Sequence, residues 1–175
     1  MKKKCIFFDR DGIVNVSPGS GYVECWEDFN LIPAFITAAQ VAIAQGYVVA
    51  IVTNQRGVAQ GIMTQATLSE MHNKLNAALT ELGVILLGIY CCPHERDSCD
   101  CRKPKPGMLL QAASEHNIDL SESWMIGDSE TDVEAGIAAG CHTIMIGSKA
   151  PQTKADIKFS DMQELAASLA KIIGM

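Results

Sequence analysis

Two aspartates at the end of an apolar segment are the residues of this chain best placed to do chemistry. Asp9 and Asp11 follow the run Cys5-Ile6-Phe7-Phe8 and precede Gly12. The run is typical of a buried strand in a parallel sheet. Residues i and i+2 of a strand share a side, so both carboxylates should converge at its carboxyl end, where α/β sheets bind ligands. Because adjacent acids repel unless a cation or shared proton intervenes, the pair indicates a metal site or acid/base chemistry; the alternative is a solvated acidic turn.

Two further predicted strands end in polar residues that suit phosphate chemistry. The segment Tyr47–Val52 is followed by Thr53 and Asn54, which offer a hydroxyl, an amide and backbone N–H groups for phosphate oxygens. The segment Trp124–Ile126 leads into Asp128, which can complete a hard-cation site with Asp9. Carboxylates with water and a phosphate ligand describe a magnesium site.

A pair of basic residues, Arg102 and Lys103, adds positive charge from the loop after the third predicted strand. Each feature has a plain alternative: Thr53 in a strand-end turn, Asp128 as a helix N-cap, and the basic pair as solvated loop charge. Together, at one edge of a sheet, they predict a phosphoryl-transfer site.

A separate cluster has the residue types of a metal site. Cys92-x-His94 is followed by Cys99-x-Cys101, and three thiols with an imidazole can close a tetrahedral, structural zinc site. This spacing is less usual than C-x-x-C, so free thiols remain the alternative. The loop 91–105 is therefore a candidate zinc loop. The histidines outside it have no clustered partners and are expected to be non-catalytic: His72, His116 and His142.

Composition narrows the class of protein. The 175 residues are 48% hydrophobic with a net charge of −6, which fits one globular domain, 1–175, and disfavours binding to nucleic acid or to an anionic membrane. The longest uncharged apolar run, Val84–Cys92, is too short to span a bilayer. The first apolar run stops at Asp9, so no signal peptide is expected. We expect a monomeric cytoplasmic protein.

Strand and helix patterns alternate along the chain, which predicts a three-layer α/β/α Rossmann-like sandwich with a mainly parallel sheet and no large cap domain. The expected strands are 5–8, 47–52, 84–90, 124–126, 141–146 and a short 156–159. The expected helices are 33–46, one from Thr64 or Thr67 to Gly83, 106–117, 133–139 and 161–173.

The order of these motifs resembles the haloacid dehalogenase (HAD) superfamily of phosphatases. The motifs are Asp9-x-Asp11-Gly12, Thr53-Asn54, Lys103 and Gly127-Asp128-x-x-x-Asp132. Within that superfamily, almost the whole chain is similar to the heptose bisphosphate phosphatases. The further matching segments are Asn15, Gly21-Tyr22-Val23, Thr53-Asn54-Gln55, Cys92-Pro93-His94, Cys99-Asp100-Cys101-Arg102-Lys103-Pro104 and Pro106-Gly107-Met108-Leu109-Leu110.

The resemblance implies a role for each acid. Asp9 would be the nucleophile that forms an aspartyl-phosphate. Asp11 would protonate the departing sugar oxygen and then act as base for water. Thr53 and Lys103 would bind the equatorial phosphate oxygens. Magnesium would be held by Asp9, the Asp11 carbonyl and Asp128, with Asp132 orienting the site, and relatives imply structural zinc at the cysteine cluster.

The implied substrate is a small phosphorylated sugar, D-glycero-D-manno-heptose 1,7-bisphosphate, which would lose its 7-phosphate on the way to nucleotide-activated heptose and lipopolysaccharide. Histidinol phosphate is the alternative substrate, and a catalytically dead, zinc-stabilised binding module is the alternative of another class. The expected substrate-binding residues are Ser20, Gly21, Tyr22, Thr53, Asn54, Gln55, Arg56, Arg102 and Lys103. Arg56 departs from the small residue expected there and could contact a second phosphate.

Overall fold

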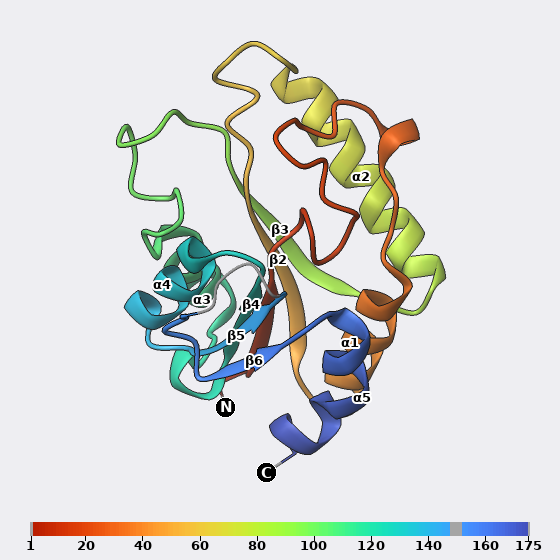
Figure 1. Cartoon of the computed structure of the whole chain (residues 1–175), viewed down its shortest axis with the longest axis vertical. Coiled ribbons are helices and arrows are strands. Elements are labelled where there is room, and N and C mark those ends of the chain that lie inside the picture. The colour runs from red at the N-terminus through yellow and green to blue at the C-terminus, as the bar shows by residue number, and fades with distance from the viewer. Residues whose placement is uncertain (1, 148–151, 175) are drawn as a thin grey trace.

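A single parallel sheet forms the centre of the protein in a computed structural model, which describes residues 2–147 and 152–174 (Figure 1). The strand order is β3-β2-β1-β4-β5-β6, and all five pairings are parallel. The strands are β1 (Cys5–Phe8), β2 (Val48–Asn54), β3 (Leu86–Cys92), β4 (Trp124–Gly127), β5 (His142–Ile146) and β6 (Ile157–Phe159). The predicted fold class is confirmed.

Helices cover both faces of the sheet. One face packs against α1 (Pro33–Ala44), α2 (Gln65–Glu81) and α5 (Met162–Ile173), and the other against α3 (Gly107–His116) and α4 (Glu130–Ala139). Alternate residues of β1 supply the two cores: Ile6 and Phe8 face the first set of helices, and Cys5 and Phe7 the second. Burial on both faces explains why this strand has no polar residue before Asp9.

Two short 3-10 helices complete the described elements, η1 (Trp26–Asp28) and η2 (Leu120–Glu122). Among residues 2–147 and 152–174, no helix has the length and apolar character that crossing a lipid bilayer requires.

Several boundaries differ from the predicted ones, and the differences bear on the site. Strand β3 lies two residues later than expected, so Cys92 is its last residue. Helix α4 begins three residues earlier than expected, with Ser129 as its N-cap. Asp128 therefore does not cap this helix, which removes the plain explanation for that carboxylate. For α2 the N-cap is Thr64 and not Thr67, because the Thr64 side chain accepts a hydrogen bond from the Thr67 backbone N–H.

Candidate active site

The nucleophile candidate lies where β1 ends. The backbone N–H of Asp9 donates to the Ile126 carbonyl on β4 (2.9 Å), so the aspartate is still aligned with the sheet. The chain then turns tightly, and the Arg10 carbonyl accepts from the N–H groups of Val14 (2.8 Å) and Asn15 (3.1 Å). This turn places Asp9 at the carboxyl edge of the sheet, as the sequence predicted.

Gly12 makes the turn compatible with a second carboxylate. Its φ of +94° lies in the left-handed region that favours glycine. A Cβ at this position would collide with the carboxylate of Asp128. Gly127 has the same relation to Asp132, whose carboxyl group occupies the space that a Cβ would need. Two glycines therefore allow two acids to approach the end of β1.

Lys103 joins Asp9 and Asp132 into one buried cluster. Its ammonium lies 2.7 Å from Asp9 Oδ1 and 2.6 Å from Asp132 Oδ1, and it donates to the Val52 carbonyl at 2.8 Å. Three acceptors match the three protons of an ammonium group. Burial lowers the pKa of Lys103, but the carboxylates of Asp132 and Asp9 outweigh this effect and raise the pKa above its ordinary value. Lys103 is therefore a fixed positive charge beside Asp9.

The pKa of the Asp9 carboxyl is raised, whereas a salt bridge with lysine alone would lower it. Burial raises its pKa from 3.8 to about 7, against the lowering effect of Lys103, and the neighbouring carboxylates of Asp132 and Asp128 raise it further. One lysine does not balance three acids. The site therefore has an excess of negative charge that a cation would relieve.

The three acids fit a divalent metal ion. Asp9, Asp128 and Asp132 each offer a carboxylate oxygen, and these oxygens lie within 4.8 Å of one another. Asp132 already uses Oδ1 for Lys103 and Oδ2 for the backbone N–H (3.1 Å) and hydroxyl (2.6 Å) of Ser129. Its carboxylate is thus occupied in positioning Lys103 and the start of α4, which fits an orienting role better than direct ligation. Oxygen ligands of this kind suit Mg²⁺.

Asp11 lies beside this cluster and is held by a dense set of donors. Its Oδ1 accepts from Asn15 Nδ2 (2.9 Å) and Arg10 Nη2 (3.1 Å), and its Oδ2 accepts from Gln55 Nε2 (2.8 Å) and Arg10 Nη2 (3.1 Å). The carboxylate is about a quarter exposed, because its side-chain relative accessibility is 24%. It therefore has both a fixed orientation and contact with solvent, as an acid/base residue requires.

The residues at the end of β2 contact Lys103 and Asp11. Thr53 is buried and its Oγ1 accepts from Gln55 Nε2 (2.9 Å). The Asn54 amide makes a reciprocal pair with the Lys103 backbone, as Nδ2 donates to the Lys103 carbonyl (3.1 Å) and Oδ1 accepts from the Lys103 N–H (3.1 Å). The side chains of Asn54 and Gln55 thus hold Lys103 and Asp11, and their assignment to substrate binding stays a prediction.

The other predicted substrate contacts lie on loops around the same edge. Tyr22 and Gln60 form a hydrogen bond (3.1 Å), and with the Gln60 amide turned over, its oxygen accepts from Arg56 at 3.2 Å. Arg56 also pairs with Glu95 of the candidate zinc loop (91–105) at 3.7 Å. Three loops that are distant in sequence therefore meet through Arg56. Ser20 and Gly21 are exposed on the first of these loops.

A hollow of about 480 Å³ borders Lys103. It is lined by Arg102, which brings the second basic residue predicted for the site to its edge, and by Arg96 and Lys105. Arg102 Nη1 is buried without a hydrogen-bond partner among the described residues. A donor in this state suits an anionic group of a ligand.

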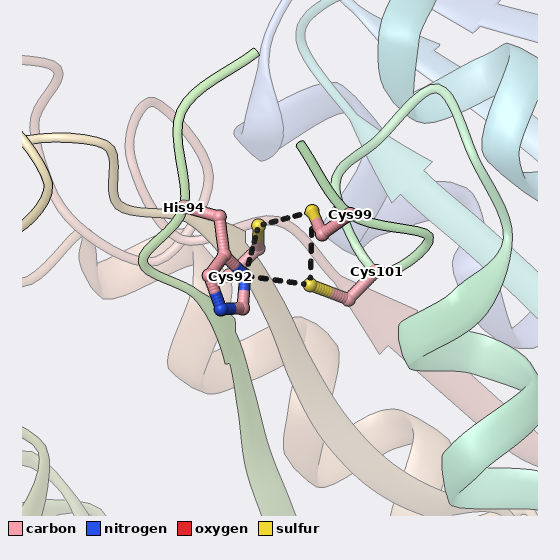
Figure 2. A group of neighbouring side chains, drawn as sticks. All are labelled: Cys92, His94, Cys99 and Cys101. Atoms are coloured by element: carbon pink, nitrogen blue, oxygen red, sulfur yellow. Dashed lines mark hydrogen bonds between the residues drawn. The ribbon is translucent and has the colours of Figure 1, made fainter. Parts of the chain in front are cut away.

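The cysteine cluster lies next to this hollow, since Cys99 is among its lining residues. Figure 2 shows the four side chains of the cluster. Cys92 Sγ lies 3.5 Å from Cys99 Sγ, Cys99 Sγ lies 3.3 Å from Cys101 Sγ, and His94 Nδ1 lies 3.2 Å from Cys101 Sγ and 3.7 Å from Cys92 Sγ. A tetrahedral zinc ion with thiolate ligands has sulfur–sulfur separations of about 3.8 Å. The four ligand atoms therefore fit a closed tetrahedral site.

The thiols also show why a cation suits this cluster. Burial raises the pKa of Cys99, but hydrogen bonds from the Cys101 thiol and the Arg102 backbone outweigh it and lower the pKa to about 6. Burial and the two neighbouring thiols raise the pKa of Cys101. A thiolate at Cys99 beside a protonated Cys101 is the state expected of close thiols without an ion, and a bound metal stabilises the thiolate form of its cysteine ligands.

Two residues of the site had no role in the sequence-based assignment. Arg10 and His72 contact each other behind Asp11, with Arg10 Nη1 lying 3.2 Å from His72 Nε2. Arg10 stands between the two aspartates in the sequence, and its position was a readable signal. Nothing in the sequence of α2 links His72 to it.

Comparison with known proteins agrees with this geometry. Residues 100–171 match the HAD-hydrolase-like family model. The chain is 40% identical to the D-glycero-β-D-manno-heptose-1,7-bisphosphate 7-phosphatase of Pasteurella multocida, with 98% of this chain and 97% of that protein covered. It is 34% identical to the enzyme of that name from Pseudomonas aeruginosa, with 97% and 99% covered.

The chain belongs to the D-glycero-β-D-manno-heptose-1,7-bisphosphate 7-phosphatase family of HAD-like hydrolases. Members of this family are phosphoric monoester hydrolases, and so is this protein. A solved structure of the D,D-heptose 1,7-bisphosphate phosphatase from B. bronchiseptica, complexed with magnesium and phosphate, has a TM-score of 0.85 at 30% identity and covers 97% of this chain and 99% of that one.

Proposed function

We propose that this phosphatase removes the 7-phosphate of D-glycero-β-D-manno-heptose 1,7-bisphosphate through a covalent phosphoryl intermediate on Asp9. The observation that carries the proposal is the convergence of Asp9, Lys103, Asp128 and Asp132 at one edge of the sheet, with Asp11 two residues from the nucleophile. Near full-length similarity to phosphatases of that name supports the choice of substrate.

Magnesium is the cofactor that this acid cluster fits. Asp9, Asp128 and the Asp11 carbonyl would hold the ion, while Asp132 positions Lys103. The bound ion would supply positive charge that offsets the repulsion between the phosphate and the carboxylates.

Asp9 and Lys103 perform the first step. A carboxylate oxygen of Asp9 attacks phosphorus, a new P–O bond forms, and the bond between phosphorus and the sugar oxygen breaks. Lys103 and the Thr53 hydroxyl bind the equatorial oxygens as charge spreads over them. Lys103 is already fixed by Asp132 and the Val52 carbonyl, so it does not need to reorganise during the step.

Asp11 moves the protons. It gives its proton to the departing sugar oxygen, and then takes a proton from the water that attacks the phosphorus of the aspartyl-phosphate. The bond from phosphorus to Asp9 breaks, inorganic phosphate leaves, and the Asp9 carboxylate is restored. The partial exposure of Asp11 gives both the sugar oxygen and water access to it.

Zinc at Cys92, His94, Cys99 and Cys101 would have a structural role. The site has no open position for a substrate, which is typical of structural zinc. The loop that it closes also carries Lys103, so zinc would hold the catalytic lysine in place as well as Arg102.

Substrate choice would lie in the loops around the edge. Without a large cap domain, Tyr22, Arg56 and Arg102 are the side chains best placed to contact the sugar and its second phosphate, together with Ser20 and Gly21. We further propose that the enzyme acts as a monomer in the cytoplasm, where phosphorylated sugars are metabolised, and sedimentation of the purified protein tests the first part.

A substrate panel tests the function. The panel contains both anomers of the heptose bisphosphate and histidinol phosphate, with phosphate release as the rate and ³¹P NMR to identify which phosphate leaves. We expect the highest kcat/KM for the β-anomer and loss of its 7-phosphate only. A higher kcat/KM for histidinol phosphate would overturn the substrate, and no magnesium-dependent hydrolysis of any ester would favour a binding module.

A further inference from the structure

Arg10 is a charged side chain without any exposed surface, packed between β1 and α2. Its relative accessibility is 0%, and its guanidinium lies over the Phe29 ring at 5.5 Å. One end binds Asp11 through Nη2, at 3.1 Å from each carboxylate oxygen. The other end, Nη1, meets His72 Nε2 at 3.2 Å and Met71 Sδ at 3.9 Å, both on α2. The guanidinium thus connects the proposed acid/base residue to α2, whose contacting residues lie 61 and 62 positions along the chain from Arg10.

The contact with His72 defines the state of its ring. Arg10 has only donors, so His72 Nε2 must accept, and the imidazole is neutral with its proton on Nδ1. Burial, followed by the charge of Arg10, lowers the pKa of His72 to about 4, which agrees with a neutral ring at physiological pH. His72 therefore provides a fixed acceptor, and Arg10 retains its charge for Asp11.

We propose that His72 and Arg10 are positioning residues for Asp11, an inference that rests on the acid/base role proposed above. Asn15 and Gln55 each hold one oxygen of Asp11. Arg10 binds both oxygens, but it is the chain neighbour of Asp11, so its guanidinium needs an anchor outside this turn to keep its position. His72 supplies that anchor on the opposite side of the guanidinium. A general acid must lie within about 3 Å of the atom that it protonates, and a displacement of about 1 Å can cost about 100-fold in rate.

Two substrates with different leaving groups can distinguish a positioning role from a purely structural one. A sugar oxygen must be protonated as it departs, whereas p-nitrophenolate is a stable anion that departs without a proton. The ratio kcat/KM covers events up to the first P–O cleavage, so a misplaced Asp11 should lower this ratio for the sugar phosphate and spare it for p-nitrophenyl phosphate. General loss of folding would lower both alike.

The experiment compares His72→Leu with His72→Gln and with Asn76→Leu. Leucine fills the site without an acceptor, glutamine restores an acceptor, and Asn76 lines the same groove one turn along α2 without a bond to Arg10. We expect His72→Leu to lose about 10- to 100-fold in kcat/KM on the heptose bisphosphate with p-nitrophenyl phosphate nearly unchanged. His72→Gln should recover most of the loss, and Asn76→Leu should resemble the wild type.

Arg10→Lys provides a second route if His72→Leu does not fold. Lysine lacks the planar fork of donors through which Arg10 reaches Asp11 and His72 from separate nitrogens, so the same selective loss is expected. Equal losses on both substrates in these variants, or no loss on either, would overturn the proposal. Asp11→Asn is the reference: a selective loss there without one in the His72 and Arg10 variants refutes only the positioning role, whereas no selective loss in Asp11→Asn refutes the acid role itself.

Discussion

Replacing Asp9, the proposed nucleophile, with asparagine should abolish turnover and stabilise the magnesium-free protein. Asp9 has a pKa of about 7 in the fold against a reference of 3.8, a difference of about 3 pKa units. At about 1.4 kcal/mol per unit, the charged carboxylate costs the folded state up to about 4 kcal/mol. The cause is burial near two further carboxylates, which outweighs the attraction of Lys103.

The raised pKa of Asp9 makes the folded protein less stable as pH rises. The folded-state pKa is above the unfolded one, so the neutral carboxyl favours folding at low pH, and this contribution is lost as pH rises from about 4 to about 7. Asp9→Asn keeps the shape of the side chain and has no charge to lose. Lys103 would retain its partners Asp132 and the Val52 carbonyl. Asp9→Asn should therefore be more stable than the wild type at pH 8, by about 2–4 kcal/mol. The difference should fall to about half or less by pH 5 and close near pH 4.

Urea unfolding from pH 5 to pH 8 measures this difference. The buffer should lack magnesium and also lack chelator, so that metal at the cysteine cluster is kept. Glu122→Gln is a matched control, because it neutralises an exposed acid and should shift stability by only a few tenths of a kcal/mol. Added magnesium should stabilise the wild type and not Asp9→Asn. Equal stability at pH 8, or a gap that does not change with pH, would refute the charge argument.

Three further substitutions test the supports of the site. Gly12→Ala should lower activity by about 100-fold or more, because its Cβ would displace the Asp128 carboxylate at a positive φ; normal kcat and normal magnesium dependence would contradict this. Asn54→Ala should cost about 1–3 kcal/mol in urea unfolding and lower kcat, since Lys103 loses both backbone hydrogen bonds; a change in KM alone would contradict it. Cys99→Ser should lose bound zinc by elemental analysis and lose activity with the far-UV circular dichroism retained, because the loop carrying Lys103 loosens; full activity without zinc would refute the structural role.

Much of the site could be predicted from the sequence because most of its residues directly follow the predicted strands. The apolar run before Asp9, the polar pair at Thr53 and Asn54, and Asp128 after Trp124–Ile126 each mark the end of a parallel strand, and such ends meet at one edge. The strand order β3-β2-β1-β4-β5-β6 was not predicted, because parallel pairing alone is compatible with several orders. The cysteine cluster was similarly readable from four ligand-type residues within ten positions.

The structural features that the sequence did not predict depend on contacts between distant segments. Strand β3 extends to Cys92 because β2 pairs with it up to Asn54, a tertiary reason that apolar pattern cannot show. The start of α4 was readable from Ser129-x-x-Asp132, but Asp128 competed with Ser129 as the N-cap. The bond between His72 and Arg10 joins residues 62 positions apart, and no local pattern predicts it.

Trapping the phosphoryl group on the protein tests the central claim most directly. Asp11→Asn removes the proposed base for the attacking water, so the intermediate should accumulate when this variant is mixed with p-nitrophenyl phosphate and quenched in acid. Peptide mass spectrometry should find one phosphoryl group on Asp9 in Asp11→Asn, and none in a variant that also carries Asp9→Asn. A single-turnover burst of p-nitrophenol with no phosphoryl group on Asp9, or a phosphoryl group on another residue, would contradict the account.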